Sequence, residues 1–99
     1  MGNNKDKSSE TSLNTIAQDI LKLGSSSEDG IILKIQLRTE ISLQSGERSL
    51  PIDITDGKAR AEYEEAMEQL LSEGFINEDN SKQNAYRITT AGYNRAEFL

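Results

Sequence analysis

The sequence predicts a small α+β domain, and three observations lead to this fold class. The chain has 99 residues, which suit one domain and are too few for two. Two long segments repeat apolar residues at the spacing of an amphipathic helix, whereas other segments are β-branched or alternate apolar with polar residues. Clusters of serine, glycine and asparagine separate these segments and predict the turns between them.

The first helix is expected directly after a polar tail. Residues 1–11 are polar almost throughout and are expected to be disordered, so the predicted domain covers residues 12–99. Ser12 is expected to cap the helix, and Gly24 is expected to end it. Between them, apolar residues recur at positions i, i+3, i+4, i+7 and i+8. The apolar face comprises Leu13, Ile16, Ala17, Ile20, Leu21 and Leu23.

Three strands are expected next. Residues 31–37 predict a strand in which Leu33, Ile35 and Leu37 point to one face, and Lys34 and Gln36 to the other. Residues 40–43 and 50–54 then predict a small β-hairpin around a turn at residues 45–47. The second strand of this hairpin contains Pro51, which has no N–H to donate, so an edge position or an irregular strand is expected.

The strongest predicted element is a long helix over residues 56–74. Thr55 or Asp56 is expected to cap it, and Gly74 is expected to close it. Its apolar face comprises Ala59, Tyr63, Ala66, Met67, Leu70 and Leu71. A strand starting at residues 75–76, a polar loop over 77–84 and a partner strand over 85–88 follow. Thr89 is expected to cap a short terminal helix that runs to about Phe98.

Two motifs near the end of the chain resemble the winged helix-turn-helix superfamily. In that family, a leucine followed four positions later by a glycine and two hydrophobic residues ends the long helix. Here these residues are Leu70, Gly74, Phe75 and Ile76. A second motif opens the last helix, and its residues are Ile88, Thr89, Gly92 and Tyr93. The resemblance covers residues 56–96, and residues 12–24 fit as the first helix.

The resemblance implies a winged-helix-like single domain of about three helices, a small β-hairpin and a two-stranded wing. It is similar to the small winged-helix modules found at the ends of multidomain bacterial proteins. Gly74 would permit the left-handed turn into the wing, and Gly92 would let the last helix approach the wing strand closely. The chain departs from the family between its first and long helices, where it reads as strands instead of a second helix.

The composition excludes several kinds of catalytic site. The chain has no cysteine, histidine or tryptophan, which excludes disulfides, thiol nucleophiles, Cys/His zinc sites and Ser-His-Asp triads. Glu64, Glu65 and Glu68 are neighbours on one helix, but no aromatic or basic residues bracket them as in an active-site pocket. We therefore expect no enzymatic activity, no cofactor and no metal ion.

The charge pattern favours docking to another protein in a regulatory role. The chain carries 17 acidic and 11 basic residues, for a formal net charge of −6. Residues 56–74 contain six carboxylates and only two basic residues, so the outer face of the long helix is acidic. Such a face complements a basic protein surface. The candidate docking residues are Glu64, Glu65, Glu68 and Gln69.

DNA binding is the alternative that the resemblance implies, since many winged helices place the long helix in the major groove. Phosphates repel carboxylates, so the acidic long helix disfavours this alternative. The residues that would contact phosphate are Lys58, Arg60, Lys82, Arg87 and Arg95. A third, minor hypothesis for a small acidic chain is a phage-type inhibitor that mimics nucleic acid.

The sequence also bears on location and self-association. No apolar run is long enough to span a membrane, and the first residues lack the apolar stretch of a secretory signal, so a cytoplasmic protein without a membrane partner is expected. Many winged helices form homodimers through terminal helices. A homodimer of this chain would place Phe98 and Leu99 at the seam.

Overall fold

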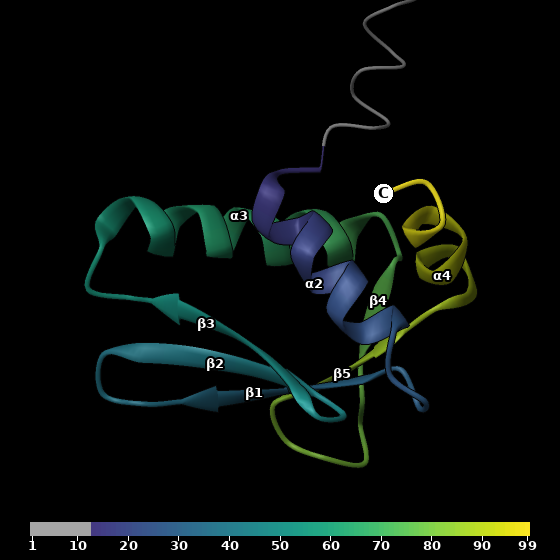
Figure 1. Cartoon of the computed structure of the whole chain (residues 1–99), viewed down its shortest axis with the longest axis horizontal. Helices are drawn as coiled ribbons and strands as arrows, with labels where there is room; N and C mark the ends of the chain where they lie inside the picture. Colours follow the sequence, from purple (N-terminus) through teal and green to yellow (C-terminus); the bar gives the residue numbers. More distant parts are fainter. Residues whose placement is uncertain (1–12) are drawn as a thin grey trace, which may run out of the picture.

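Three helices lie on one face of a five-stranded antiparallel sheet in the computed structural model, which describes residues 13–99 (Figure 1). The helices are α2 (Thr15–Ser25), α3 (Gly57–Ser72) and α4 (Thr90–Ala96). The strands are β1 (Ile31–Gln36), β2 (Glu40–Ser45), β3 (Arg48–Asp53), β4 (Ile76–Glu78) and β5 (Ala85–Ile88). The α+β class is confirmed, while the expected disordered tail lies outside the described residues.

The strands form one continuous sheet in the order β3-β2-β1-β5-β4. β1 is central, because Leu33 pairs with Gln44 of β2 on one side and with Ala85 of β5 on the other. The strand pairs predicted at residues 40–54 and 75–88 are therefore parts of a single five-stranded sheet. Alternation marks a strand without identifying its partners, so the sequence did not predict this union. Pro51 lies on β3, an edge strand, as expected.

The core fills the space between the helices and the covered face of the sheet. The helices contribute Ala17, Ile20, Leu21, Leu23, Tyr63, Ala66, Met67 and Leu70. The sheet contributes Ile32, Ile41, Leu43, Ile52, Ile76 and Ile88. Most of the predicted apolar face of each long helix is thus buried. The exceptions on α3 are Leu71, which is exposed, and Ala59, which is half-buried.

Successive side chains of β1 point to opposite faces of the sheet, and the apolar set predicted for residues 33–37 is on the uncovered side. Ile32 is 1% exposed and belongs to the core. Lys34 lies on the same face, with its ammonium nitrogen 6.0 Å from the centroid of the Tyr63 ring. Leu33 and Ile35 therefore lie on the face opposite the three helices of residues 13–99.

Side chains cap each helix. Asn14 caps α2 by accepting a 2.8 Å hydrogen bond from the Ala17 N–H, so the Ser12 cap predicted two residues earlier is wrong. The helical backbone starts at Thr15, which puts only Asn14 within reach of that N–H. Asp56 caps α3 as expected, since its Oδ1 accepts from the Lys58 N–H at 3.0 Å.

Gly24 lies inside α2, which continues to Ser25, so the predicted helix end at Gly24 is wrong. A Cβ at this position would lie 2.7 Å from Ile88 Cδ1 and 2.8 Å from Ile32 Cδ1. The missing side chain lets α2 approach the sheet closely. The serine hydroxyls that follow bind the last carbonyls of the helix and end it instead.

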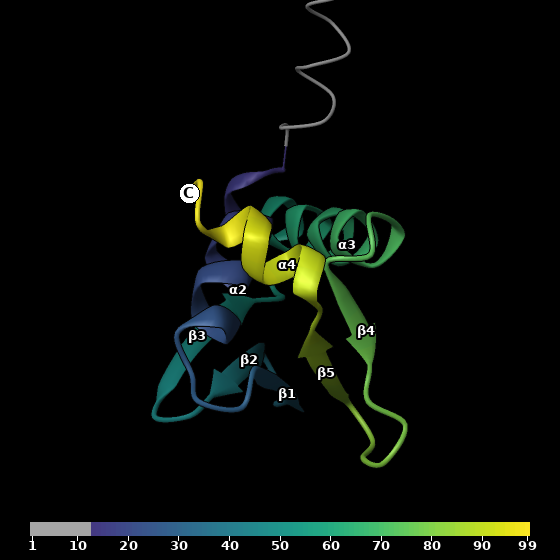
Figure 2. The same ribbon diagram turned by 90° about the vertical axis from the view of Figure 1, so that its right-hand side faces the viewer.

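The terminal helix α4 packs against the segment that follows α3, at Gly74 and Phe75. Gly74 has a φ of +74° and makes the expected left-handed turn. A Cβ at Gly92 would clash with the carbonyl oxygen of Phe75, so only glycine permits this close approach. The Thr89 hydroxyl caps α4 through the Gly92 N–H at 3.0 Å and donates to the Gly74 carbonyl at 2.6 Å. α4 lies beside α2, above β5 (Figure 2), and ends at Ala96, two residues before the predicted Phe98.

Candidate functional site

The outer face of α3, which we define by Glu64, Glu65 and Glu68, is acidic and exposed to solvent. Packing of the opposite side on the sheet decides which residues point outward. The buried residues that fix the helix in this orientation are Tyr63, Ala66, Met67 and Leu70. A rigid helix thus presents three carboxylates within five consecutive positions.

Arg60 compensates part of this negative charge. Its Nε lies 3.5 Å from Oε2 of Glu64, one turn later on the same helix. The two side chains are 61% and 65% exposed, so water screens the pair and its contribution to stability is small. Arg60 can therefore release Glu64 to a partner at little cost.

The fourth predicted docking residue, Gln69, contributes to the contact between α2 and α3. Its Oε1 accepts a 3.0 Å hydrogen bond from the Asn14 N–H, and the side chain is half-buried. Asn14 Nδ2 also donates to Oε1 of Glu65 at 3.3 Å and to the Glu62 carbonyl at 3.0 Å. These contacts join the start of α2 to α3. They span about fifty residues of sequence, so no local pattern signals them.

The structure does not gather the predicted phosphate-contacting residues on one surface. Lys58 and Arg60 are at the start of α3, Lys82 is in the β4–β5 loop, Arg87 is on β5, and Arg95 is on α4. The start of α3 and α4 lie at opposite ends of the molecule (Figure 1). Arg87 is also paired with Asp79, whose Oδ2 lies 3.5 Å from Nη2 of the arginine.

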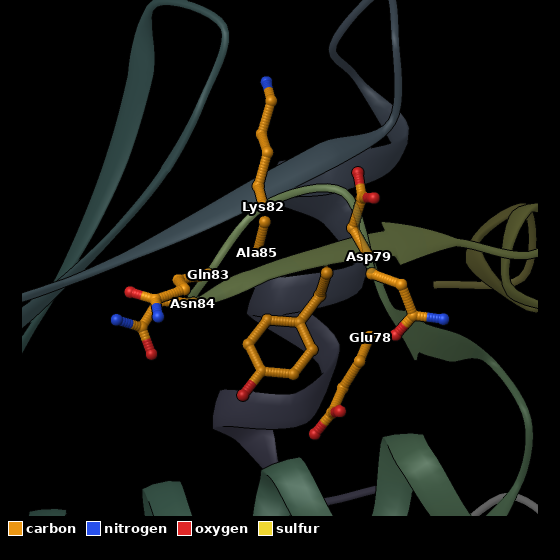
Figure 3. Close-up of a pocket in the computed structure, with 8 residues that line it drawn as sticks. Glu78, Asp79, Lys82, Gln83, Asn84 and Ala85 are labelled. Atoms are coloured by element: carbon orange, nitrogen blue, oxygen red, sulfur yellow. The ribbon is translucent and has the colours of Figure 1, made fainter.

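A pocket of about 260 Å³ lies at the β4–β5 loop, and its lining is largely polar. Figure 3 shows the Lys82 and Glu78 side chains pointing in opposite directions, so they do not converge on one point. Asp79 accepts hydrogen bonds from the Ser81 N–H at 3.0 Å and the Ser81 hydroxyl at 2.6 Å. These bonds lower the pKa of Asp79 and hold the loop in its turn. The arrangement is that of a structured loop.

The tyrosines on the helix side of the sheet are not activated for proton transfer at neutral pH. Burial raises the pKa of Tyr63 to about 12, with smaller contributions from Tyr86 and Glu64. Burial, followed by the Glu78 charge, also raises the pKa of Tyr86. Both hydroxyls therefore remain protonated near pH 7, which agrees with a packing role for their rings.

The sheet face opposite the helices, the open sheet face, is a second candidate surface that the sequence did not identify. Its centre is the apolar row formed by Ile31, Leu33 and Ile35 of β1. Leu33 is 37% exposed, and Leu37, just past the strand, is 49% exposed. The strand pairings put uncharged neighbours beside this row, namely Ser42, Gln44, Ser49, Pro51 and Ala85. The alternation at 33–37 predicted which residues share a face, but not that this face stays uncovered.

Within residues 13–99, no group of three or more acidic residues is arranged to hold a metal ion. None of the helices in this range combines the length and apolar character needed to cross a membrane. Comparisons with protein-family models, curated proteins and solved structures found no match for this chain.

Proposed function

We propose that this chain is a non-catalytic winged-helix binding module that regulates another protein by direct contact through the outer face of α3. The order of elements supports the winged-helix assignment, because α3 leads through the β4–β5 hairpin into α4 while β1 pairs with β5. The β2–β3 hairpin takes the place of the second helix that the superfamily has between its first and long helices.

The observation that carries the proposed function is the rigid acidic face of α3. Its carboxylates are exposed, and the helix that presents them is anchored by buried side chains on one side and by Asn14 along its flank. Because the helix that carries them is already ordered, the cost of ordering on binding is confined to the glutamate side chains. Their charge steers a basic protein surface toward the helix and repels nucleic-acid phosphates.

The arrangement supports DNA binding less well. A duplex that met the outer face of α3 would place its phosphates against Glu64, Glu65 and Glu68. The basic residues that would offset this repulsion are spread over both ends of the molecule, and two of them, Arg60 and Arg87, are paired with carboxylates.

Photo-cross-linking tests the proposed contact. A photoreactive amino acid replaces Ala61, an exposed residue of α3, and in a control it replaces Ala91, an exposed residue of α4. Mass spectrometry then identifies the cross-linked protein. The expected result is a basic partner captured from position 61 and not from position 91. Equal capture at both positions contradicts docking through α3.

A charge-matched titration of the purified partner follows. Glu64→Gln with Glu68→Gln is compared with Glu28→Gln and Glu97→Gln, which remove the same charge from exposed sites elsewhere. The α3 variant is expected to weaken binding by roughly three- to tenfold, because exposed ion pairs contribute about 0.2–1 kcal/mol each. Equal loss in both variants would mean that only net charge matters. A parallel titration of duplex DNA at about 50 and 200 mM salt supports the alternative if binding is tight and steeply salt-dependent.

A further inference from the structure

We propose that the open sheet face binds the same face of a second copy of this chain, forming a symmetric dimer that leaves both α3 outer faces accessible. The sheet separates the two surfaces, since α3 lies over one face and the apolar row lies on the other (Figure 1). The proposed dimer therefore does not depend on the partner proposed for α3.

The composition of the open sheet face is that of a protein interface. Its centre is apolar and free of charge, and charged residues occur only toward its ends. At one end, Arg87 pairs across the sheet with Ile31; at the other, Glu40 pairs with Asp53. A charge-depleted centre with a polar rim is the usual anatomy of a specific interface.

Short side chains lie beside the apolar row of β1. Ile35 stands beside Ser42, which is 7% exposed, and Leu33 stands beside Ala85, which is 3% exposed. A two-fold axis parallel to the strands and between β1 and β2 would lay the apolar row of each copy over β2 of the other. Because β1 pairs with β2 in this register, Ile35 would then lie over Ser42 and Leu33 over Gln44 of the facing sheet. Both contacts form at once, as a symmetric interface requires.

The same axis brings opposite charges together. It carries Arg87, one strand beyond β1, over the β2–β3 turn of the other copy, where Glu47 is exposed. It also carries Asp53, on β3, over the β4–β5 loop of the other copy, which contains Lys82. This charge complementarity selects a second copy over an unrelated protein as the occupant.

The size of the overlap sets the expected affinity. Because the axis lies between β1 and β2, four strands of each copy overlap, and β4 extends past the edge of the facing sheet. Four strands about 4.8 Å apart and at most about six residues of 3.3 Å each give an overlap of about 19 by 20 Å. Two such faces bury about 800 Å² at most, which is the size of a weak, transient interface. The dimer should therefore be reversible and concentration-dependent, with a dissociation constant on the order of 100 µM.

Sedimentation velocity of the full chain, over a concentration series up to about 500 µM, tests the dimer. The wild type is expected to shift from its monomer mass of 11.0 kDa to twice that mass as concentration rises. Leu33→Lys should weaken association at least tenfold, because it places two lysines in the apolar centre. Leu71→Asp on α3 and Phe98→Asp at the terminus, both exposed apolar positions, should leave association unchanged.

A charge exchange tests the register of the two copies. Arg87→Glu and Glu47→Arg should each weaken the dimer, and the double variant should restore it. Circular dichroism and thermal melts confirm that each variant is folded. A chain that stays monomeric at every concentration, a dimer broken by Phe98→Asp but not by Leu33→Lys, or a double variant without rescue would each overturn the proposal. Leu33→Lys should still bind the α3 partner, which separates this test from that of the proposed function.

Discussion

The two faces of the sheet show how different surfaces arise from one strand. On the covered face, Ile32 is buried under the helices, and the amine of Lys34 lies over the Tyr63 ring. On the open face, Leu33 and Ile35 are not covered by any helix of the described part of the chain. The side of β1 with more apolar side chains is thus the side opposite the helices.

This difference teaches that apolar content alone does not decide which side of a strand becomes core. The helices pack where all five strands contribute apolar residues, and on that face Ile32, Ile41 and Ile52 lie in adjacent strands. On the open face, by contrast, β2 and β3 present serine and glutamine side chains next to the apolar row of β1. A helix laid there would bury less apolar surface, and hydrophobic stabilisation scales with that area.

The largest expected effect compares the two faces of β1 directly. Ile32→Ala should reduce the free energy of unfolding by about 2–5 kcal/mol, because it leaves a cavity in the core. Leu33→Ala should change the free energy of unfolding by less than about 1 kcal/mol, because its side chain is already exposed. Urea unfolding followed by circular dichroism at low protein concentration measures both. Similar losses for the two variants would break the distinction between covered and open faces.

A second prediction concerns how closely the helices approach the rest of the chain. Gly92→Ala should cost about 1–3 kcal/mol, because the new Cβ would clash with the Phe75 carbonyl oxygen, which belongs to the backbone. Gly57→Ala is the matched control, since a Cβ there meets no atom within 4 Å. Thermal melts compare the two. Equal destabilisation would show that the close approach of α4 is unimportant.

A third prediction concerns Asn14, whose side chain links the start of α2 to the acidic helix α3. Asn14→Ala should cost about 0.5–2 kcal/mol through the lost cap of α2. Because Asn14 also binds Glu65 and the Glu62 carbonyl through its side chain, hydrogen exchange should rise in the first turn of α2 and in the middle of α3. Asn94→Ala, at an exposed position of α4, serves as the control. Faster exchange in α2 alone would show that the side chain of Asn14 does not stabilise α3.

The smallest expected effect is confined to alkaline pH. The pKa of Tyr63 is raised from 10.0 to about 12 in the folded chain, so between these values the folded state holds the proton that the unfolded state has released. Stability should therefore fall as pH rises from about 10 to about 12. Tyr63→Phe should flatten this part of the profile, measured by urea unfolding at each pH. An unchanged slope would mean that titratable groups other than Tyr63 cause the loss of stability at alkaline pH.

Local patterns predicted most of the elements. Apolar periodicity identified α2 and α3, and Asp56 and Thr89 were identified as caps because each side chain binds a backbone N–H within three residues. Gly24 was assigned to the wrong role because a glycine near the end of a helical pattern usually terminates the helix. Its actual role depends on Ile32 and Ile88, which are distant in sequence.

Local patterns also predicted some features of the candidate surfaces and missed those that depend on distant contacts. Helical periodicity placed Glu64, Glu65 and Glu68 on one exposed face, because the opposite residues are apolar enough to be buried. It did not predict that Gln69 joins α2 to α3, since that contact crosses 55 positions. Nor did it predict the dispersion of the basic residues, which depends on how the elements are arranged in space.

By itself, the sequence determined the α+β class, the approximate position of each element and the acidic outer side of the long helix, because periodicity and capping act within a few residues. Only the tertiary structure decided that the five strands form one sheet and that the apolar row of β1 is exposed. Strand pairing and helix docking depend on contacts between distant segments, and alternation in a single strand is compatible with either face being covered.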